Sequence, residues 1–223
     1  MRRPGGSQVI PRPPLWRPGA PPQWAHAIDA PAVPLAPLLT TIEARGPGRY
    51  PMADLDGMRR SAVLVALYDG ERGAEVVLTR RAQHMRNHKG EVSFPGGHLD
   101  PGETPAQAAL REALEEVCLD PSDVDLVGEL DHLVTVVSRS HIVPVVGRLR
   151  ARPELRAGTT EVDRIMYVPL AELLRSDTYV EEEWGTGALE RPIYFFHLDD
   201  ETIWGATGRM LVQLLAIATG VES

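Results

Sequence analysis

GHLDPGETPAQAALREALEEVCL, residues 97–119 of this 223-residue chain, joins a loop rich in glycine and proline to a clearly marked helix start. Thr104 suits the N-cap, and Pro105 suits the first helical position. Gln107 is placed to complete a capping box with Thr104. The stretch therefore predicts a helix over residues 105–117.

The predicted helix places three carboxylates on one face and an apolar stripe on the other. Glu112, Glu115 and Glu116 fall within an arc of about 100°, and the opposite stripe, which we expect to be buried, contains Leu110, Leu114 and Val117. Like charges at this spacing weaken a helix by a few tenths of a kcal/mol per pair. A hard divalent cation such as Mg²⁺ or Mn²⁺ would offset that repulsion.

An isolated acidic face is usually ordinary solvated surface, but these carboxylates belong to a wider pattern. Gly97, Glu103, the pair Arg111-Glu112 and the pair Glu115-Glu116 stand at fixed spacings of five, seven and two intervening residues. At roughly 7% per position, six specified residues match by chance about 10⁻⁵ times over the chain. Coincidence is the weaker explanation.

This pattern resembles the Nudix box, Gly-x5-Glu-x7-Arg-Glu-hydrophobic-x-Glu-Glu-x-Gly-hydrophobic. The resemblance implies an α/β class protein with the Nudix fold, a mixed β-sheet sandwiched between α-helices. Two positions depart from the box, because Ala113 is a small hydrophobic residue and Cys118 stands where the family has glycine. A non-glycine residue with positive φ costs about 1 kcal/mol, so we expect mild strain or a different helix exit at Cys118, a thiol expected to be buried.

A second resemblance lies on both sides of the box and narrows the family. Residues 78–81 (LTRR) and 86–97 (RNHKGEVSFPGG) are similar to the signature that precedes the box in coenzyme A pyrophosphatases. Residues 203–211 (IWGATGRML) look like that subfamily's entry into its C-terminal helix. The resemblance covers about residues 60–215.

The resemblance implies metal-dependent hydrolysis of a nucleoside diphosphate linked to another group. It implies metal ligands at Glu112, Glu115, Glu116 and the Gly97 carbonyl. Catalytic roles are expected at Glu103, Arg111, Glu115 and Glu161, where Arg111 orients Glu103 or Glu115 because its guanidinium cannot deprotonate. The general base stays open between a box glutamate and Glu161 of a later loop, with weaker candidates at Asp163, Glu181, Glu182 and Glu183.

The substrate is expected to be coenzyme A or a derivative, cleaved to 3′,5′-ADP and 4′-phosphopantetheine. Its 3′-phosphate calls for cations, and the dense basic cluster before the box supplies Arg80, Arg81, Arg86, His88 and Lys89. ADP-ribose, NADH or a (d)NTP are alternative substrates, and a non-catalytic nucleotide sensor is a different class of function. The remaining histidines show no ligand spacing and are expected in the core or at the surface; they are His84, His98, His132, His141 and His197. Tyr194, Phe195 and Phe196 are expected to pack in the core and not to stack on an adenine.

Composition excludes several classes of protein. With 43% hydrophobic and 24% charged residues, the chain is typical of a globular protein, and its net charge of -8 disfavours nucleic-acid or anionic-membrane binding. One cysteine excludes an intrachain disulfide and favours a reducing compartment. The apolar stretch 210–219 is too short to span a bilayer. We expect a cytoplasmic protein whose partner is a small-molecule nucleotide, with a homodimer left open.

The chain divides into three predicted parts. Residues 1–38 are proline-rich and read as an extended or disordered tail, with Trp16 and Trp24 as anchors. Residues 39–58 form a linker, and residues 59–220 form the Nudix domain. Strands are predicted at 61–68, 74–80, 125–130, 133–137, 142–149 and 191–198, and further helices at 171–176 and 207–219.

Overall fold

The computed structural model describes residues 3–51, 55–85, 88–135, 139–187 and 190–221. Its helices are α1 (Leu35–Arg45), α2 (Pro105–Val117), α3 (Leu170–Leu173) and α4 (Gly205–Ala218), with 3-10 turns at Ala25–Ala27 and Pro121–Asp123. Its strands are β1 (Trp16–Pro18), β2 (Arg59–Gly70), β3 (Gly73–Arg81), β4 (Val92–Ser93), β5 (Gly96–His98), β6 (Val124–Glu129), β7 (Leu133–Thr135), β8 (Ser140–Leu149), β9 (Val162–Pro169), β10 (Tyr179–Trp184), β11 (Arg191–His197) and β12 (Thr202–Trp204).

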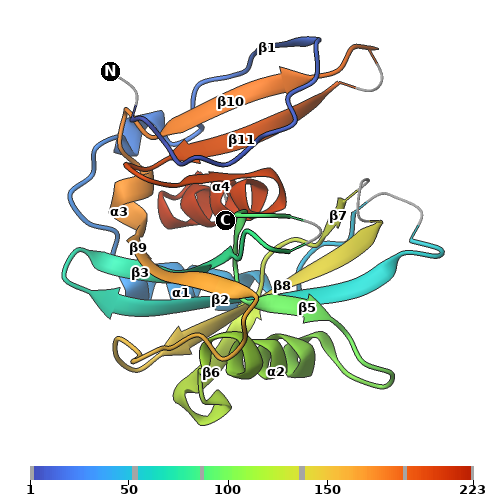
Figure 1. Cartoon of the computed structure of the whole chain (residues 1–223). Coiled ribbons are helices and arrows are strands. Elements are labelled where there is room, and N and C mark those ends of the chain that lie inside the picture. Colours follow the sequence, from blue (N-terminus) through green and yellow to red (C-terminus); the bar gives the residue numbers. More distant parts are fainter. Residues whose placement is uncertain (1–2, 52–54, 86–87, 136–138, 188–189, 222–223) are drawn as a thin grey trace.

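Two sheets organise these elements (Figure 1). The larger is mixed and runs β4-β3-β2-β8-β6, with β5 also paired to β2, β7 to β8 and β9 to β3. Within it β2 and β8 are parallel, whereas β2 and β3 form an antiparallel hairpin. Helix α2 covers one face of this sheet, and α1 and α4 pack on the other. The expected mixed sheet between helices is therefore confirmed.

The smaller sheet, β1-β10-β11-β12, lies over α4 on the side away from the larger sheet (Figure 1). Phe195 and Phe196 of β11 are buried, as expected, while Tyr194 is only half-buried. Phe196 belongs to the same apolar core as Leu211 and Leu215 of α4. The α4 helix is thus enclosed between two sheets, which explains its largely apolar sequence.

Helix α2 begins and ends at the predicted residues. The Thr104 hydroxyl accepts from the Gln107 amide at 3.3 Å, and the Gln107 side chain accepts from the Thr104 amide at 2.9 Å. Of the predicted stripe, Val117 is buried and Leu110 packs against the same core, but Leu114 is 46% exposed, which corrects that part of the prediction. The other buried residues of the helix are Ala108, Ala109, Ala113 and Glu116. Small alanines let the helix lie close to β2, and this rotation carries Glu116 inward.

Cys118 ends α2 in the left-handed conformation, with φ 55° and ψ 34°. Its amide donates to the carbonyl of Leu114 at 3.0 Å. The helix exit is therefore the one that glycine would give, and the cysteine adopts it at the cost of strain. The thiol is half-exposed, which corrects the expectation of a buried sulfur.

The N-terminal segment packs on the rest of the chain. Strand β1 pairs antiparallel with β10, and Trp24 is 1% exposed against Tyr179 and Phe196. Helix α1 crosses the expected tail–linker boundary between residues 38 and 39. Pro37 is tolerated there because amides in the first turn of a helix need no intrahelical partner. No helix among the described residues is long and apolar enough to cross a membrane.

Candidate active site

Arg111, in the middle of α2, is the centre of a hydrogen-bond network that joins the helix to the loop before it. Its Nε and Nη2 donate to the two carboxylate oxygens of Glu103 at 2.9 and 3.1 Å. Nη2 also donates to the carbonyl of His98 at 2.9 Å, and Nη1 donates to Glu112 at 3.0 Å. These contacts raise the pKa of Arg111, and the pKa of Glu103 is lowered by Arg111 and by the Asp100 amide. The Arg111 guanidinium lies closer to Glu103 than to Glu115, which is 3.6 Å away.

Glu116 is the buried carboxylate of the group. It is 9% exposed, accepts from the Gly96 amide at 3.2 Å, and has the Arg81 guanidinium 4.0 Å away. Burial raises the pKa of Glu116 to about 7, and the neighbouring charge of Glu112 acts in the same direction. One amide and one distant cation compensate this buried charge only in part.

Gly97 leaves the space that the Glu112 carboxylate occupies. A Cβ at Gly97 would lie 2.3 Å from Glu112 Oε1, so any other residue there would displace the carboxylate from this position against β5. The box glycine and the box glutamate are therefore linked by direct contact. Glu115, by contrast, is exposed.

Glu161 lies at the same site, although it is 45 residues from Glu116 in sequence. Its carboxylate contacts Arg81 Nη2 at 3.0 Å, and its carbonyl accepts from the Ala82 amide at 2.7 Å. Of the weaker base candidates, Asp163 pairs with Arg80 at 2.7 Å. Glu181, Glu182 and Glu183 lie on β10 of the smaller sheet, where Glu182 binds Arg12 and the Trp184 indole.

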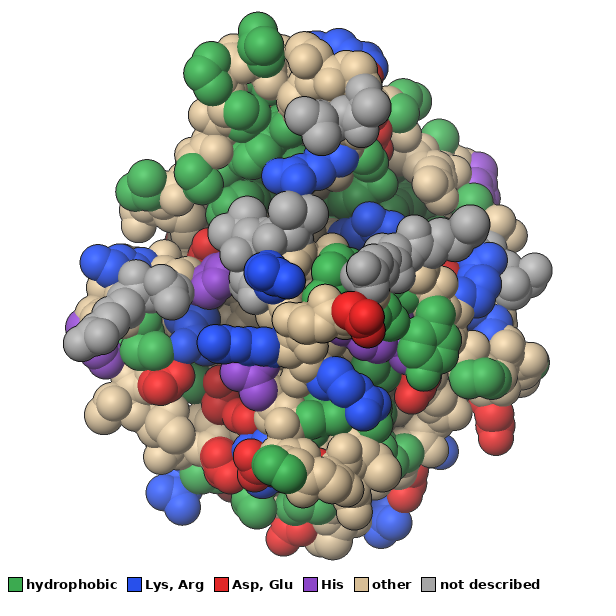
Figure 2. All heavy atoms as spheres, turned by 90° about the vertical axis from the view of Figure 1, so that its right-hand side faces the viewer, with side chains coloured by type: hydrophobic (Ala, Val, Ile, Leu, Met, Phe, Trp, Pro, Cys, Tyr) green, Lys and Arg blue, Asp and Glu red, His purple; other side chains and the backbone are tan. Residues whose placement is uncertain are grey.

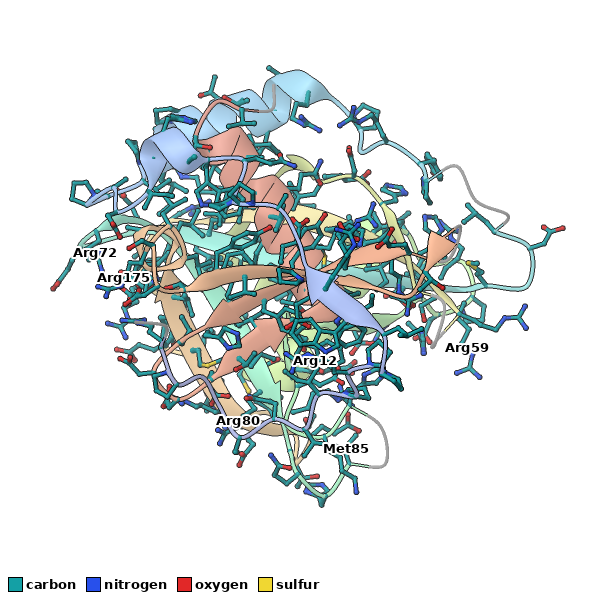
Figure 3. The ribbon with its side chains drawn as sticks, turned by 90° about the horizontal axis from the view of Figure 1, so that it is seen from above. Arg12, Arg59, Arg72, Arg80, Met85 and Arg175 are labelled. Carbon is teal, nitrogen blue, oxygen red and sulfur yellow. The ribbon has the colours of Figure 1, made fainter. Side chains whose placement is uncertain are left out.

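The predicted basic cluster is divided at the end of β3, where the register with β9 shifts between Arg80 and Arg81. Arg80 binds Asp163 and the buried Glu201, which also accepts from Gln8 of the N-terminal segment. Figure 3 shows Arg80 beside that segment. Arg81 instead faces the box carboxylates.

The other members of the cluster lie in the loop that follows β3. His88 is exposed and bonds Glu91 at 2.7 Å, which raises the pKa of the imidazole. Lys89 is exposed, and Arg86 lies outside the described residues. On the face shown in Figure 2, acidic side chains gather in the lower left part, with basic side chains directly above them.

The donor set suits a hard divalent cation. Glu112, Glu115 and Glu116 offer carboxylate oxygens, the ligands that Mg²⁺ and Mn²⁺ prefer, and Glu116 is buried with little compensation. Among the described residues, however, no three acidic, histidine or cysteine side chains are arranged to hold a metal ion. In this conformation Glu112 is paired with Arg111, and Glu116 has Arg81 as its neighbouring cation.

Two buried polar clusters could not be predicted from the sequence. His132 and His141 are buried and bond each other at 3.0 Å, and His132 also bonds Glu129 at 3.0 Å. Burial, followed by His132 and Arg60, lowers the pKa of His141. Glu201, 1% exposed, anchors Arg80 and Arg164. Sequence spacing gives no sign of either group, because each joins residues from separate elements.

Comparison with known proteins identifies the family. A family model for the NUDIX domain matches residues 58–186. The chain is 33% identical over 170 residues to the "Uncharacterized Nudix hydrolase NudL" of Enterobacter sp. (strain 638), covering 76% of this chain and 87% of that protein. The protein of the same description from Yersinia pestis (strain Pestoides F) is 34% identical over 157 residues, covering 70% and 78%. "Nudix hydrolase 3" of Caenorhabditis elegans is 28% identical over 183 residues, covering 74% and 76%. The chain therefore belongs to the Nudix hydrolases, a family that cleaves phosphoanhydride bonds in nucleoside diphosphate derivatives.

Proposed function

We propose that this Nudix hydrolase cleaves the diphosphate of coenzyme A or of an acylated derivative, giving 3′,5′-ADP and 4′-phosphopantetheine. One observation carries the proposal: Arg81, from the signature upstream of the box, contacts Glu161 at 3.0 Å and lies 4.0 Å from Glu116 of the box. The substrate-related signature and the box thus meet at one point. A diphosphate bound there would contact the carboxylates indirectly, through a shared divalent cation. It would contact the guanidinium group of Arg81 directly.

The division of work follows from the geometry. Arg111 fixes Glu103 and Glu112, so those carboxylates keep their positions when charge accumulates nearby. Glu112, Glu115 and Glu116 would hold Mg²⁺ or Mn²⁺, which when bound neutralises the diphosphate and lowers the pKa of water. Arg81 is placed to donate to a phosphate oxygen.

Glu161 is the general base that the geometry favours. Its side chain is 49% exposed and stands beside the buried Glu116, so it can reach a solvent water next to the diphosphate. It would take the proton of the attacking water as the new P–O bond forms and the bridging P–O bond breaks. Glu115, 53% exposed on the same helix as Glu112 and Glu116, is the second choice.

Recognition of the 3′-phosphate would fall to His88 and Lys89. Arg80 is already paired with Asp163 and Glu201, so its charge is largely neutralised. His88 and Lys89 are exposed, and hydrogen bonding to Glu91 favours the charged form of His88. A phosphate dianion is recognised by such cationic donors.

The test is a product assay with coenzyme A and Mg²⁺ or Mn²⁺, with ADP-ribose, NADH and dGTP as parallel substrates. Release of 3′,5′-ADP with coenzyme A preferred would support the proposal. Preference for another substrate would contradict the coenzyme A assignment, and no turnover by folded protein would favour a nucleotide sensor. The Glu116→Gln variant, purified in the same way, should lose at least about tenfold in kcat. That loss would show that the activity does not come from a contaminating hydrolase.

A further inference from the structure

Two arginines at this site are held in contrasting ways. Every nitrogen of the Arg111 guanidinium donates a hydrogen bond, to Glu103, Glu112 or the His98 carbonyl. Arg81 makes one such bond, from Nη2 to Glu161, while its Nη1 lies 4.0 Å from Glu116. Its Nε is buried and has no hydrogen-bond partner among the residues that the structure describes. Arg111 is a fixed part of the site, whereas Arg81 is held mainly by charge.

The backbone around Arg81 explains how it reaches the carboxylates. The register of β3 against β9 shifts between Arg80 and Arg81, an irregularity that re-aims side chains. The Arg81 amide donates to the Glu91 carbonyl at 2.9 Å, and the Ala82 amide donates to the Glu161 carbonyl. Arg81 therefore approaches Glu116 from the sheet, independently of α2. A side-chain movement can separate the pair without any change in the helix.

The charges around Glu116 require a cation. Glu112 and Glu161 both act on it electrostatically, and within the described chain Arg81 is the cation that acts directly on Glu116. The described carboxylates are not arranged to hold a metal ion as they stand. A divalent cation that binds Glu116 must therefore replace the Arg81 guanidinium as the charge beside that carboxylate.

We propose that Arg81 is an exchangeable counter-ion: it neutralises Glu116 and Glu161 in the metal-free protein, leaves Glu116 to the divalent cation, and then donates to the substrate diphosphate. This inference rests on the metal-dependent hydrolysis proposed above. It adds a coupling between ligands, since the cation frees the arginine that the diphosphate needs. By linkage, the diphosphate must strengthen cation binding by the same factor.

The experiment measures binding rather than turnover. Mn²⁺ is titrated at pH 8.5 with detection of free Mn²⁺ by electron paramagnetic resonance, with and without methylenediphosphonate, a non-hydrolysable diphosphate; a protein-free titration corrects for the Mn²⁺ that the diphosphonate itself chelates. The variants are Arg81→Gln, which removes the charge, and Arg81→Lys, which keeps it. Arg150→Gln is the matched control, because Arg150 is 70% exposed and follows β8 at the end of the sheet away from Arg81.

Arg81→Gln should bind Mn²⁺ alone about fivefold more tightly than the wild type, as expected for the loss of one partly screened charge pair. It should bind methylenediphosphonate at least about tenfold more weakly, and each ligand should strengthen the other less than in the wild type, because only their direct attraction remains. Arg81→Lys and Arg150→Gln should keep the wild-type Mn²⁺ affinity within about twofold.

Unchanged or weaker Mn²⁺ binding by Arg81→Gln would overturn the inference, as would full coupling in that variant. If Arg81→Gln does not fold, Arg81→Lys decides, because a compact ammonium cannot form the bidentate contact of a guanidinium and must lose diphosphonate affinity at wild-type Mn²⁺ affinity. Loss of neither would also overturn it. A wild type that shows the exchange but does not hydrolyse coenzyme A would contradict the proposed substrate and leave the counter-ion role supported.

Discussion

Replacing Glu116 with glutamine is expected to stabilise the metal-free protein. Burial raises the pKa of Glu116 from 4.5 to about 7, so between these values the folded state keeps a proton that the unfolded state releases. Stability contributed by this group therefore falls as pH rises through that window. The difference corresponds to about 3 kcal/mol, an upper value for the gain of Glu116→Gln at pH 8. Below pH 4.5 both forms are neutral and the gain should vanish.

Urea denaturation in EDTA between pH 4 and 8.5 measures the effect. Glu115→Gln is the matched control, because Glu115 is 53% exposed and its replacement should change the free energy of unfolding by less than about 0.5 kcal/mol. With saturating Mn²⁺ the wild type should become more stable than Glu116→Gln, because a cation that binds the folded state stabilises the wild type more. Equal stability of wild type and Glu116→Gln at pH 8 would refute the reasoning.

Three further changes test other parts of the structure. Cys118→Gly should raise the free energy of unfolding by up to about 1 kcal/mol, because φ is 55° there; a loss of stability in denaturant titration would contradict the strained exit. Arg111→Lys should lower kcat at least about tenfold with little change in melting temperature, since lysine cannot hold Glu103 with two parallel bonds; near-normal kcat would mean that Glu103 needs no such support. Trp24→Ala should destabilise the whole protein by about 3–5 kcal/mol in one cooperative transition, whereas separate melting of the N-terminal segment would show that it is not part of the core.

Helix α2 could be predicted residue by residue because its signals are local. The Thr104–Gln107 capping box and Pro105 specify the start without reference to the rest of the chain. Its orientation could not be predicted this way, because wheel arithmetic assigns Leu114 to the core by hydrophobicity. The sheet instead accepts the helix along Ala109 and Ala113, where small side chains allow close approach. Val117 and Leu110 of the predicted stripe still pack against the core, so tertiary packing overturns the prediction only at Leu114.

The tryptophan anchor of the N-terminal segment was predicted at Trp24, but strands β1 and β10 were not, for related reasons. Ten prolines before residue 38 remove backbone donors, which normally indicates a chain without regular structure. Here β1 is an edge strand of three residues, where Pro18 needs no partner on its outer side. Strand β10 reads as an acidic run, yet Val180, Glu182 and Trp184 alternate on its buried face and Glu182 is neutralised by Arg12. Burial of these residues depends on partners that are far away in sequence.

The charged residues of the site could likewise be predicted only in part. The spacing of the box predicted that Glu103, Arg111, Glu112 and Glu116 share one site. The structure places them together because one helix and the loop before it carry all four. The basic cluster was inferred from the high density of basic residues along the chain. That density does not show which of Arg80 and Arg81 points toward the carboxylates. Adjacent residues of a strand face opposite sides, so one of the two had to point away from α2. Glu201 takes up the charge of Arg80, whereas Arg81 is left with an incompletely bonded guanidinium beside Glu116. The arginine with fewer partners is therefore the one with capacity to bind a phosphate.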